Sequence, residues 1–293
     1  MSAQPCNNFA CILQSCRIKN IGKTLVVKIP SVIFSLFAVI STALPAQDLS
    51  FREIPTRDGV KQKFVYQKAI EPVASAVLFQ GGPGAIGAFG SAEKGWVRND
   101  AGFLSGGTDR FVKNGISAVA VDAPSDRGNL NNGFRSTPEH AQDIAAVMAF
   151  LRREAPGKPV CLVGTSNGSL SATSVAALLV EQGPECIVLT SSVSAKPQSS
   201  IIARFAHVFT DADLTKIKVP VLIVHHKNDS CKYTPYEPMP GYVKAFANSP
   251  KVDFITVDGG QDHSDSCNRG HHQFLGIERE ITAQISDWIK DLR

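Results

Sequence analysis

After Gln47 the chain alternates runs of consecutive apolar residues with segments in which apolar residues recur every three or four positions. The runs predict strands that are buried on both faces, and the recurring pattern predicts helices. Strands are expected at 63–67, 73–80, 116–122, 160–163, 186–190, 219–225 and 252–257, and helices at 137–156, 170–179 and 277–292. This alternation indicates an α/β fold, a mostly parallel, doubly wound sheet with helices on both faces.

The first 46 residues have a different pattern. They contain no acidic residue, and an apolar run at 29–43 is followed by small residues that include Ala43 and Ala46. This order is typical of a secretory signal peptide cleaved after Ala43 or Ala46. As a helix, the run would span only ~22 Å against ~30 Å for a bilayer core, so a stable membrane anchor is the weaker alternative.

Removing residues 1–46 leaves 47–293 as a single domain. The segment 192–218 is the only stretch between two late strands with room for a cap, so no large cap domain is expected. The segment 1–46 predicts an exported protein, either periplasmic or secreted.

The net charge of +4 belongs to the same leader. The chain has 30 basic and 26 acidic residues, and four of the basic residues lie before residue 47, which leaves 26 of each sign in the body. A neutral body gives no charge-based argument for nucleic acid as a partner, so a small molecule is the expected partner.

The clearest chemical signal is a G-x-S-x-G pattern with Ser166 at its centre. It follows the apolar run at 160–163 and precedes the helix expected at 170–179. A tight strand-to-helix turn needs small residues around the serine, and it lifts the serine oxygen above the sheet edge. Ser166 is therefore the candidate nucleophile.

A nucleophilic serine needs a base and an orienting acid, which in this architecture follow two later strands. Asp229 comes after the strand expected at 219–225, and His263 after the strand expected at 252–257. His271 and His272 lie only eight and nine residues further on. His263 is the preferred base because it comes soonest after the last strand.

An oxyanion hole would combine the backbone N–H that follows the nucleophile, that of Asn167, with one from the loop at 80–84. Glycines there let the backbone approach a substrate oxygen closely. Gly82 is the preferred donor, because Pro83 has no N–H.

These residues, in this order, resemble the α/β-hydrolase family over nearly the whole body. The stretches 121–127 and 225–231 are similar to those of small exported hydrolases, mostly uncharacterised. The run 81–84 is similar to that of proline iminopeptidases, which usually have His where this chain has Gln80 and which carry a large helical cap. Dienelactone hydrolases use a cysteine nucleophile, whereas this chain has Ser166. The resemblance therefore implies ester chemistry.

The body contains four cysteines. Cys231 lies two residues after Asp229 and Cys267 four after His263, so a disulfide between them would join the two catalytic loops. Cys161 and Cys186 lie in apolar runs, where buried thiols and a disulfide are about equally expected. The alternative is a zinc site drawn from the candidate ligands His225, His226, Asp229, Cys231, His263, Cys267, His271 and His272, although their spacing matches no standard zinc motif.

The sequence thus predicts an exported serine hydrolase that cleaves a small carboxylic ester through an acyl-enzyme, with no metal or other cofactor. The alternatives are a peptidase or amidase, a zinc-dependent hydrolase, and a hydrolase fold used only as a binding module. The identity of the ester and the oligomeric state do not follow from the sequence.

Overall fold

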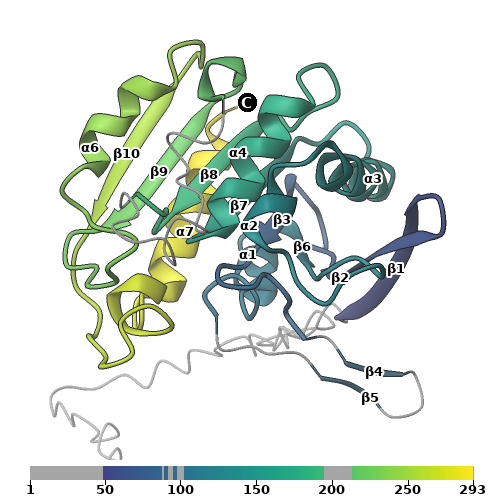
Figure 1. The fold of residues 1–293 in the computed structure, drawn as a ribbon, viewed down its shortest axis with the longest axis horizontal. Coiled ribbons are helices and arrows are strands. Elements are labelled where there is room, and N and C mark those ends of the chain that lie inside the picture. The colour runs from purple at the N-terminus through teal and green to yellow at the C-terminus, as the bar shows by residue number, and fades with distance from the viewer. Residues whose placement is uncertain (1–48, 88, 92–94, 98–101, 195–212, 293) are drawn as a thin grey trace, which may run out of the picture. The chain divides into compact units, whose positions relative to one another are not determined.

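The structure is a computed structural model that describes residues 49–87, 89–91, 95–97, 102–194 and 213–292 (Figure 1). All of them belong to one compact unit, Pro45–Arg293. The expected signal peptide at 1–46 and most of the segment 192–218 lie outside the described residues.

Among the described residues, eight strands form one sheet in the order β1-β2-β6-β3-β7-β8-β9-β10. β1 pairs with β2, and β2 with β6, in antiparallel fashion, and the remaining neighbours are parallel. The strands are β1 (Ser50–Arg57), β2 (Val60–Gln67), β3 (Ala74–Phe79), β6 (Ile116–Val121), β7 (Val160–Thr165), β8 (Cys186–Thr190), β9 (Val221–His226) and β10 (Val252–Val257), with a separate hairpin of β4 (Phe89–Ser91) and β5 (Gly95–Val97).

Helices cover both faces of this sheet, as Figure 1 shows. One hydrophobic cluster joins the sheet to α3 (Pro138–Glu154) and α4 (Gly168–Leu178), and a second joins it to α1 (Thr108–Lys113) and α7 (Glu278–Lys290). The shorter helices are α2 (Asn132–Arg135), η2 (Leu214–Lys216), α6 (Met239–Tyr242), η3 (Val243–Ala245) and η4 (Gly270–Gln273). Within the described ranges, no helix is long and apolar enough to cross a membrane.

Strand β3 illustrates why the apolar runs form the centre of the sheet. Val77 and Phe79 pack into the cluster with α3 and α4, whereas Ala76 and Leu78 pack into the cluster with α1 and α7. Successive side chains of a strand point to opposite faces, so a strand covered on both sides needs apolar residues at every position. The expected doubly wound α/β architecture is therefore correct.

The sequence pattern missed strand β1. Its eight residues are half-buried or exposed, contain Pro55, and lack an apolar run. β1 is an edge strand of the sheet, where proline is tolerated because one side of the strand needs no hydrogen-bonded partner. An edge strand carries a weaker hydrophobic pattern than a central one.

Helix α3 begins as the sequence predicts. The Thr137 side chain accepts a hydrogen bond from the N–H of His140 at 3.2 Å, and Pro138 occupies the first turn. The imidazole of His140 is fully buried against the rings of Phe79 and Phe134, and neither of its nitrogens has a partner in the described structure. Burial, with a smaller contribution from the charge of Arg135, lowers the pKa of His140 to about 3.

We expect this histidine to make the protein less stable in acid. The folded-state pKa of about 3 lies below the ordinary value of 6.5, so the unfolded chain binds the proton more readily. The free energy of unfolding should therefore fall as the pH drops from about 6.5 towards 3, by at most about 1.4 kcal/mol per pH unit for one group. The variant His140→Phe should flatten this dependence, measured by urea denaturation at pH 7.5 and at pH 5.

The quantity to compare between wild type and variant is the slope of the unfolding free energy against pH, not the unfolding free energy itself. His225 and His226 also have pKa values lowered by burial, so the variant should retain part of the slope. An unchanged pH dependence in His140→Phe would contradict the role given to this side chain.

Candidate active site

Three loops that leave the carboxyl ends of strands carry the predicted site. Gly81 and Gly82 follow β3, Ser166 follows β7, and Asp229 follows β9. These strands are parallel within the sheet, so their carboxyl ends lie along the same edge. The sheet thereby gathers residues that are far apart in the sequence.

Ser166 lies at the turn between β7 and α4 with a φ of 53°. This left-handed conformation is uncommon for residues other than glycine and marks local strain. The flanking glycines make the turn possible: a Cβ at Gly164 would collide with the backbone of Gly168, and a Cβ at Gly168 would collide with the carbonyl of Phe79. The G-x-S-x-G pattern thus reflects backbone crowding at a half-buried serine.

The first glycine of the β3 loop packs against the same serine. A Cβ at Gly81 would lie 2.7 Å from the Cβ of Ser166 and 3.3 Å from its Oγ. Glycine at this position lets the β3 loop come into contact with the candidate nucleophile.

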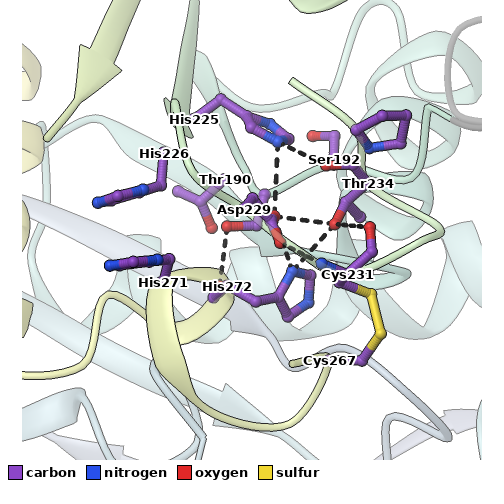
Figure 2. A network of polar contacts seen from close by, with 12 residues as sticks. Thr190, Ser192, His225, His226, Asp229, Cys231, Thr234, Cys267, His271 and His272 are labelled. Atoms are coloured by element: carbon purple, nitrogen blue, oxygen red, sulfur yellow. Dashed lines mark hydrogen bonds and ion pairs between the residues drawn. A yellow bond between two sulfur atoms is a disulfide. The ribbon is translucent and has the colours of Figure 1, made fainter. Parts of the chain in front are cut away.

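Asp229 is paired with His272. The Asp229 Oδ2 lies 2.9 Å from the Nδ1 of His272, and both side chains are almost completely buried (Figure 2). His272 belongs to η4, which follows β10 through the loop 258–269. The pair has the composition and geometry of an orienting acid and a base.

Several further donors surround the carboxylate of Asp229. Its Oδ1 accepts from the N–H of Cys231 at 3.0 Å, and its Oδ2 accepts from the Thr234 hydroxyl at 2.8 Å. The Nε2 of His225 lies 3.5 Å from Oδ2, on the side opposite His272 in Figure 2. Burial alone would raise the pKa of Asp229, but the hydrogen bond from His272 and the other donors outweigh it and lower that pKa.

The contact with the carboxylate of Asp229 indicates the tautomer of His272. An ionised carboxylate only accepts hydrogen bonds. The proton of the contact therefore belongs to Nδ1 of His272, which donates a hydrogen bond to Asp229. The neutral ring then has a lone pair on Nε2, which makes no hydrogen bond within the described part of the chain. This nitrogen has the electronic structure of a general base.

The prediction that His263 is the base disagrees with this geometry. Nδ1 of His263 accepts a hydrogen bond from the backbone N–H of Asp265 at 3.0 Å, and the backbone N–H of His263 donates to Oδ1 of Asp262 at 2.8 Å. Among the described contacts, none joins His263 to Asp229. His263 is engaged in its own turn, and His272 takes the position beside the acid.

Two residues that the sequence did not single out hold His272 in place. The hydroxyl of Ser191 donates to the carbonyl of His272 at 2.9 Å, and Ser191 itself has a left-handed φ of 42°. Thr234 bridges the pair, with its hydroxyl 3.1 Å from Nδ1 of His272. Neither has a local sequence signal, because each acts through a contact with a distant segment.

The candidate oxyanion donors Gly82 and Asn167 lie on adjoining loops. The side chain of Asn167 donates to the carbonyl of Gly82 at 3.4 Å, and Asn167 is the N-cap of α4. Within the described residues, the backbone N–H groups of Gly81, Gly82 and Asn167 have no hydrogen-bond acceptor. Their role at a substrate oxygen stays a prediction.

A cleft of about 330 Å³ opens beside the serine. It is lined by Ser166, by Gly81, Gly82 and neighbours from the β3 loop, and by Gln80, Asp265, Asn268 and Gln273. Most of the side chains that contribute polar atoms carry an amide or a carboxylate. The cleft can therefore accommodate a small molecule with polar groups.

Both cysteine pairs of the body are disulfides. Cys231 is joined to Cys267, as expected, and Cys161 to Cys186 directly across the β7/β8 pair. The bridge Cys231–Cys267 ties the Asp229 loop to the segment that leads into η4, as Figure 2 shows. It therefore limits how far the segments that carry Asp229 and His272 can move apart.

The alternative zinc site is not assembled. Its two cysteines are in the disulfide and offer no thiolate, and the described residues contain no cluster of three potential ligands arranged for a metal ion. His226 and His271 instead stack face to face, with ring centroids 4.1 Å apart. The Nε2 of His225 is bonded to the carbonyl of Thr234.

Comparison with solved structures identifies the fold. The structure is similar to the Pyrococcus furiosus esterase Pf2001, with a TM-score of 0.58 and 15% identity over 84% of this chain and 91% of the other. Est1E from Butyrivibrio proteoclasticus has a TM-score of 0.55 and 14% identity over 83% of this chain and 99% of that one. A dienelactone hydrolase from Anabaena variabilis has a TM-score of 0.55 and 12% identity over 84% of this chain and 99% of its own.

The chain therefore has the α/β-hydrolase fold. No protein-family model and no curated protein sequence matches it.

The disulfide near the acid should affect turnover as well as stability. We expect Cys231→Ser with Cys267→Ser to lower the melting temperature, since closing a loop of this length contributes roughly 3–4 kcal/mol. Hydrolytic turnover per folded molecule should also fall, because the contact between Asp229 and His272 loses its external support. Thermal denaturation and ester hydrolysis, measured on the same preparation, test both effects.

The other disulfide provides the matched control. Cys161 and Cys186 lie near the amino ends of β7 and β8, away from the edge that carries Ser166. Replacing both by serine should lower the melting temperature but leave turnover per folded molecule unchanged. Equal losses of turnover in the two double variants would refute the specific role of Cys231–Cys267.

Proposed function

We propose that the protein is a serine hydrolase that cleaves carboxylic esters. Ser166 is the nucleophile, His272 the general base and Asp229 the residue that orients His272. The observation that carries the proposal is the buried 2.9 Å contact between Asp229 and His272, on the sheet edge that also presents Ser166. Esterases among the solved structures of the same fold add support.

The proposed reaction proceeds in two steps through an acyl-enzyme. Ser166 Oγ attacks the ester carbonyl as Nε2 of His272 takes its proton, and the histidine then gives this proton to the departing alcohol. Water, deprotonated by the same nitrogen, releases the acid and restores the serine. Asp229 keeps the proton on Nδ1 and stabilises the imidazolium that forms in each step.

The negative oxygen of the tetrahedral intermediate needs donors that are already in place. We assign this role to the backbone N–H groups of Gly82 and Asn167, which have no acceptor among the described residues. The helix that begins at Gly168 adds a favourable dipole for negative charge.

The cleft supports a short, polar ester as the substrate. Its volume of about 330 Å³ is at the lower end for small-molecule sites, and Gln80, Asn268 and Gln273 contribute amide groups to its walls. Turnover should therefore decline with increasing acyl length. A panel of aryl esters of graded acyl length, with matched anilides, tests this preference and separates an esterase from an amidase.

Export belongs to the same proposal. The leader 1–46 predicts it, and two disulfides form most readily in an oxidising compartment such as the periplasm or the extracellular space. No cofactor takes part in the proposed reaction.

The nucleophile is tested by a fluorophosphonate probe and by Ser166→Ala. We expect the probe to label Ser166 in the wild type, and the variant to lose at least about 10⁴-fold in turnover, because its contribution is chemical. Peptide mapping by mass spectrometry locates the label, and circular dichroism checks the fold. A folded Ser166→Ala variant with more than a tenth of the wild-type activity would exclude Ser166 as the nucleophile and favour a metal-dependent hydrolase. A wild-type protein with neither label nor activity would favour a binding role.

The base is tested by three parallel alanine substitutions. His272→Ala should lose activity to a similar extent as Ser166→Ala, whereas His263→Ala and His271→Ala should retain most of it. Only His272 contacts Asp229 at hydrogen-bonding distance among the three. Steady-state kinetics on one aryl ester decides, and an inactive His263→Ala with an active His272→Ala would reverse the assignment.

A further inference from the structure

Arg135, the last residue of α2, has the largest of the fully buried side chains among the described residues. It forms no ion pair with a carboxylate in the described structure. Burial lowers its pKa to about 9, so the guanidinium is still charged at neutral pH. A buried, unpaired charge is costly unless neutral acceptors compensate it.

Its acceptors are all neutral oxygens. Nε donates to the carbonyl of Leu130 at 3.0 Å, and Nη1 donates to the hydroxyl of Ser171 at 2.8 Å. Nη2 lies between two carbonyls of the β3 loop, at 3.2 Å from that of Gln80 and 3.3 Å from that of Gly82. Nη2 of Arg135 thus holds both ends of the segment 80–82, which borders Ser166.

Two further carbonyls of this loop, those of Gly81 and Pro83, are also occupied. The Gly81 carbonyl accepts from the N–H of Gly84 at 3.1 Å, and that of Pro83 accepts from Leu130 at 2.7 Å. The N–H groups of Gly81 and Gly82, in contrast, have no acceptor within the described residues. Within the described residues, the fold therefore engages the four carbonyls of residues 80–83 and leaves the N–H groups of Gly81 and Gly82 free.

The planarity of the peptide bond links these two facts. In a trans peptide the C=O and the following N–H point in opposite directions. Because the Gln80 carbonyl points at Arg135, the Gly81 N–H points away from it. Gly81 and Gly82 both line the cleft that contains Ser166.

Gly84 supplies an independent observation. Its φ is +72°, and a Cβ there would collide with Nη2 of Arg135 and come within 2.9 Å of the Leu130 Cβ. The last glycine of the run 81–84 thus leaves the space that the guanidinium occupies.

We propose that Arg135 is a positioning residue: it holds the carbonyls of Gln80 and Gly82 so that the N–H groups of Gly81 and Gly82 are presented to the oxyanion. The inference rests on the proposed serine-hydrolase function. It adds Gly81 to the donors and assigns a role to a residue that never touches the substrate.

The positive charge strengthens the effect. The Gln80 carbonyl, which accepts a hydrogen bond from this cation, is polarised, so the N–H of Gly81 in the same peptide becomes a better donor. The Gly82 carbonyl shares its peptide with Pro83, which has no N–H, so its bond to Arg135 only fixes the position of the loop. The contribution is larger in the transition state, where the substrate oxygen carries more negative charge than in the ester. Loss of Arg135 should therefore lower kcat and leave KM nearly unchanged.

The test compares Arg135→Met, Arg135→Lys and Gly84→Ala with the wild type, normalised to the folded fraction. We expect kcat to fall about 10²–10³-fold in Arg135→Met, as for loss of an oxyanion donor, with KM within about 3-fold. The inhibition constant of phenylboronic acid, which mimics the tetrahedral intermediate, should rise by a similar factor. Arg135→Lys should recover part of the loss, because it restores the charge.

Gly84→Ala keeps the charge but displaces the guanidinium, so it should lower kcat in the same direction even if Arg135→Met does not fold. Hydrogen exchange of the loop 80–84, followed by mass spectrometry, should become faster in both variants. This second readout does not depend on activity.

Arg57→Met is the matched control, since it removes an arginine that forms a 2.9 Å ion pair with the buried Asp143 and donates no hydrogen bond to the loop 80–84 in the described structure. It should lower stability without changing kcat. Normal kcat and unchanged exchange in Arg135→Met or Gly84→Ala, or an equal kcat loss in Arg57→Met, would overturn the positioning role. Activity that survives Ser166→Ala would instead refute the serine-hydrolase proposal, so the two failures are distinguishable.

Discussion

Three backbone segments meet around Ser166 with no space for side chains between them. The end of β3, the turn after β7 and the start of α4 approach so closely that Gly81, Gly164 and Gly168 cannot carry a Cβ without a collision. This crowding holds Ser166 in a left-handed conformation that an isolated peptide would rarely adopt. This turn sets the position of the Ser166 oxygen, and the other groups of the candidate site can act only if they lie within reach of it.

Two buried charges belong to this site, and neither is neutralised by an opposite full charge in the described structure. The carboxylate of Asp229 is surrounded by N–H and O–H donors, and the guanidinium of Arg135 by carbonyl and hydroxyl acceptors. An ion pair between them would cancel the fields that each exerts. Compensation by neutral dipoles instead keeps a negative charge beside the histidine and a positive charge behind the β3 loop.

Much of the fold follows from short-range pattern. Runs such as 73–80 and 160–163 predict central strands because burial on both faces demands apolar residues at every position, and those strands are present as β3 and β7. The turn at Ser166 also carries a local signal, since the steric demands there act on Gly164 and Gly168, two positions away on either side. Strand β1 carries no such signal, because an edge strand buries little and tolerates Pro55.

The histidine required a different kind of information. The position directly after the last strand favoured His263. The loop 258–269, however, is long enough to return the chain to Asp229 only where η4 begins. The bridge at Cys267 does not discriminate either, since His263 precedes it by four residues and His272 follows it by five.

What separates these two histidines is the chemistry of their neighbours. Phe274 and Leu275 follow His272, and Phe274 is fully buried against Phe103, so this segment is drawn into the core. His263 lies among polar residues that include Asp262 and Asp265. The side chain of Asp262 and the backbone N–H of Asp265 form hydrogen bonds with His263 within one turn, and this segment lies near solvent. A base that shares a buried proton with a carboxylate must itself be buried, and apolar neighbours are the local feature that provides this burial.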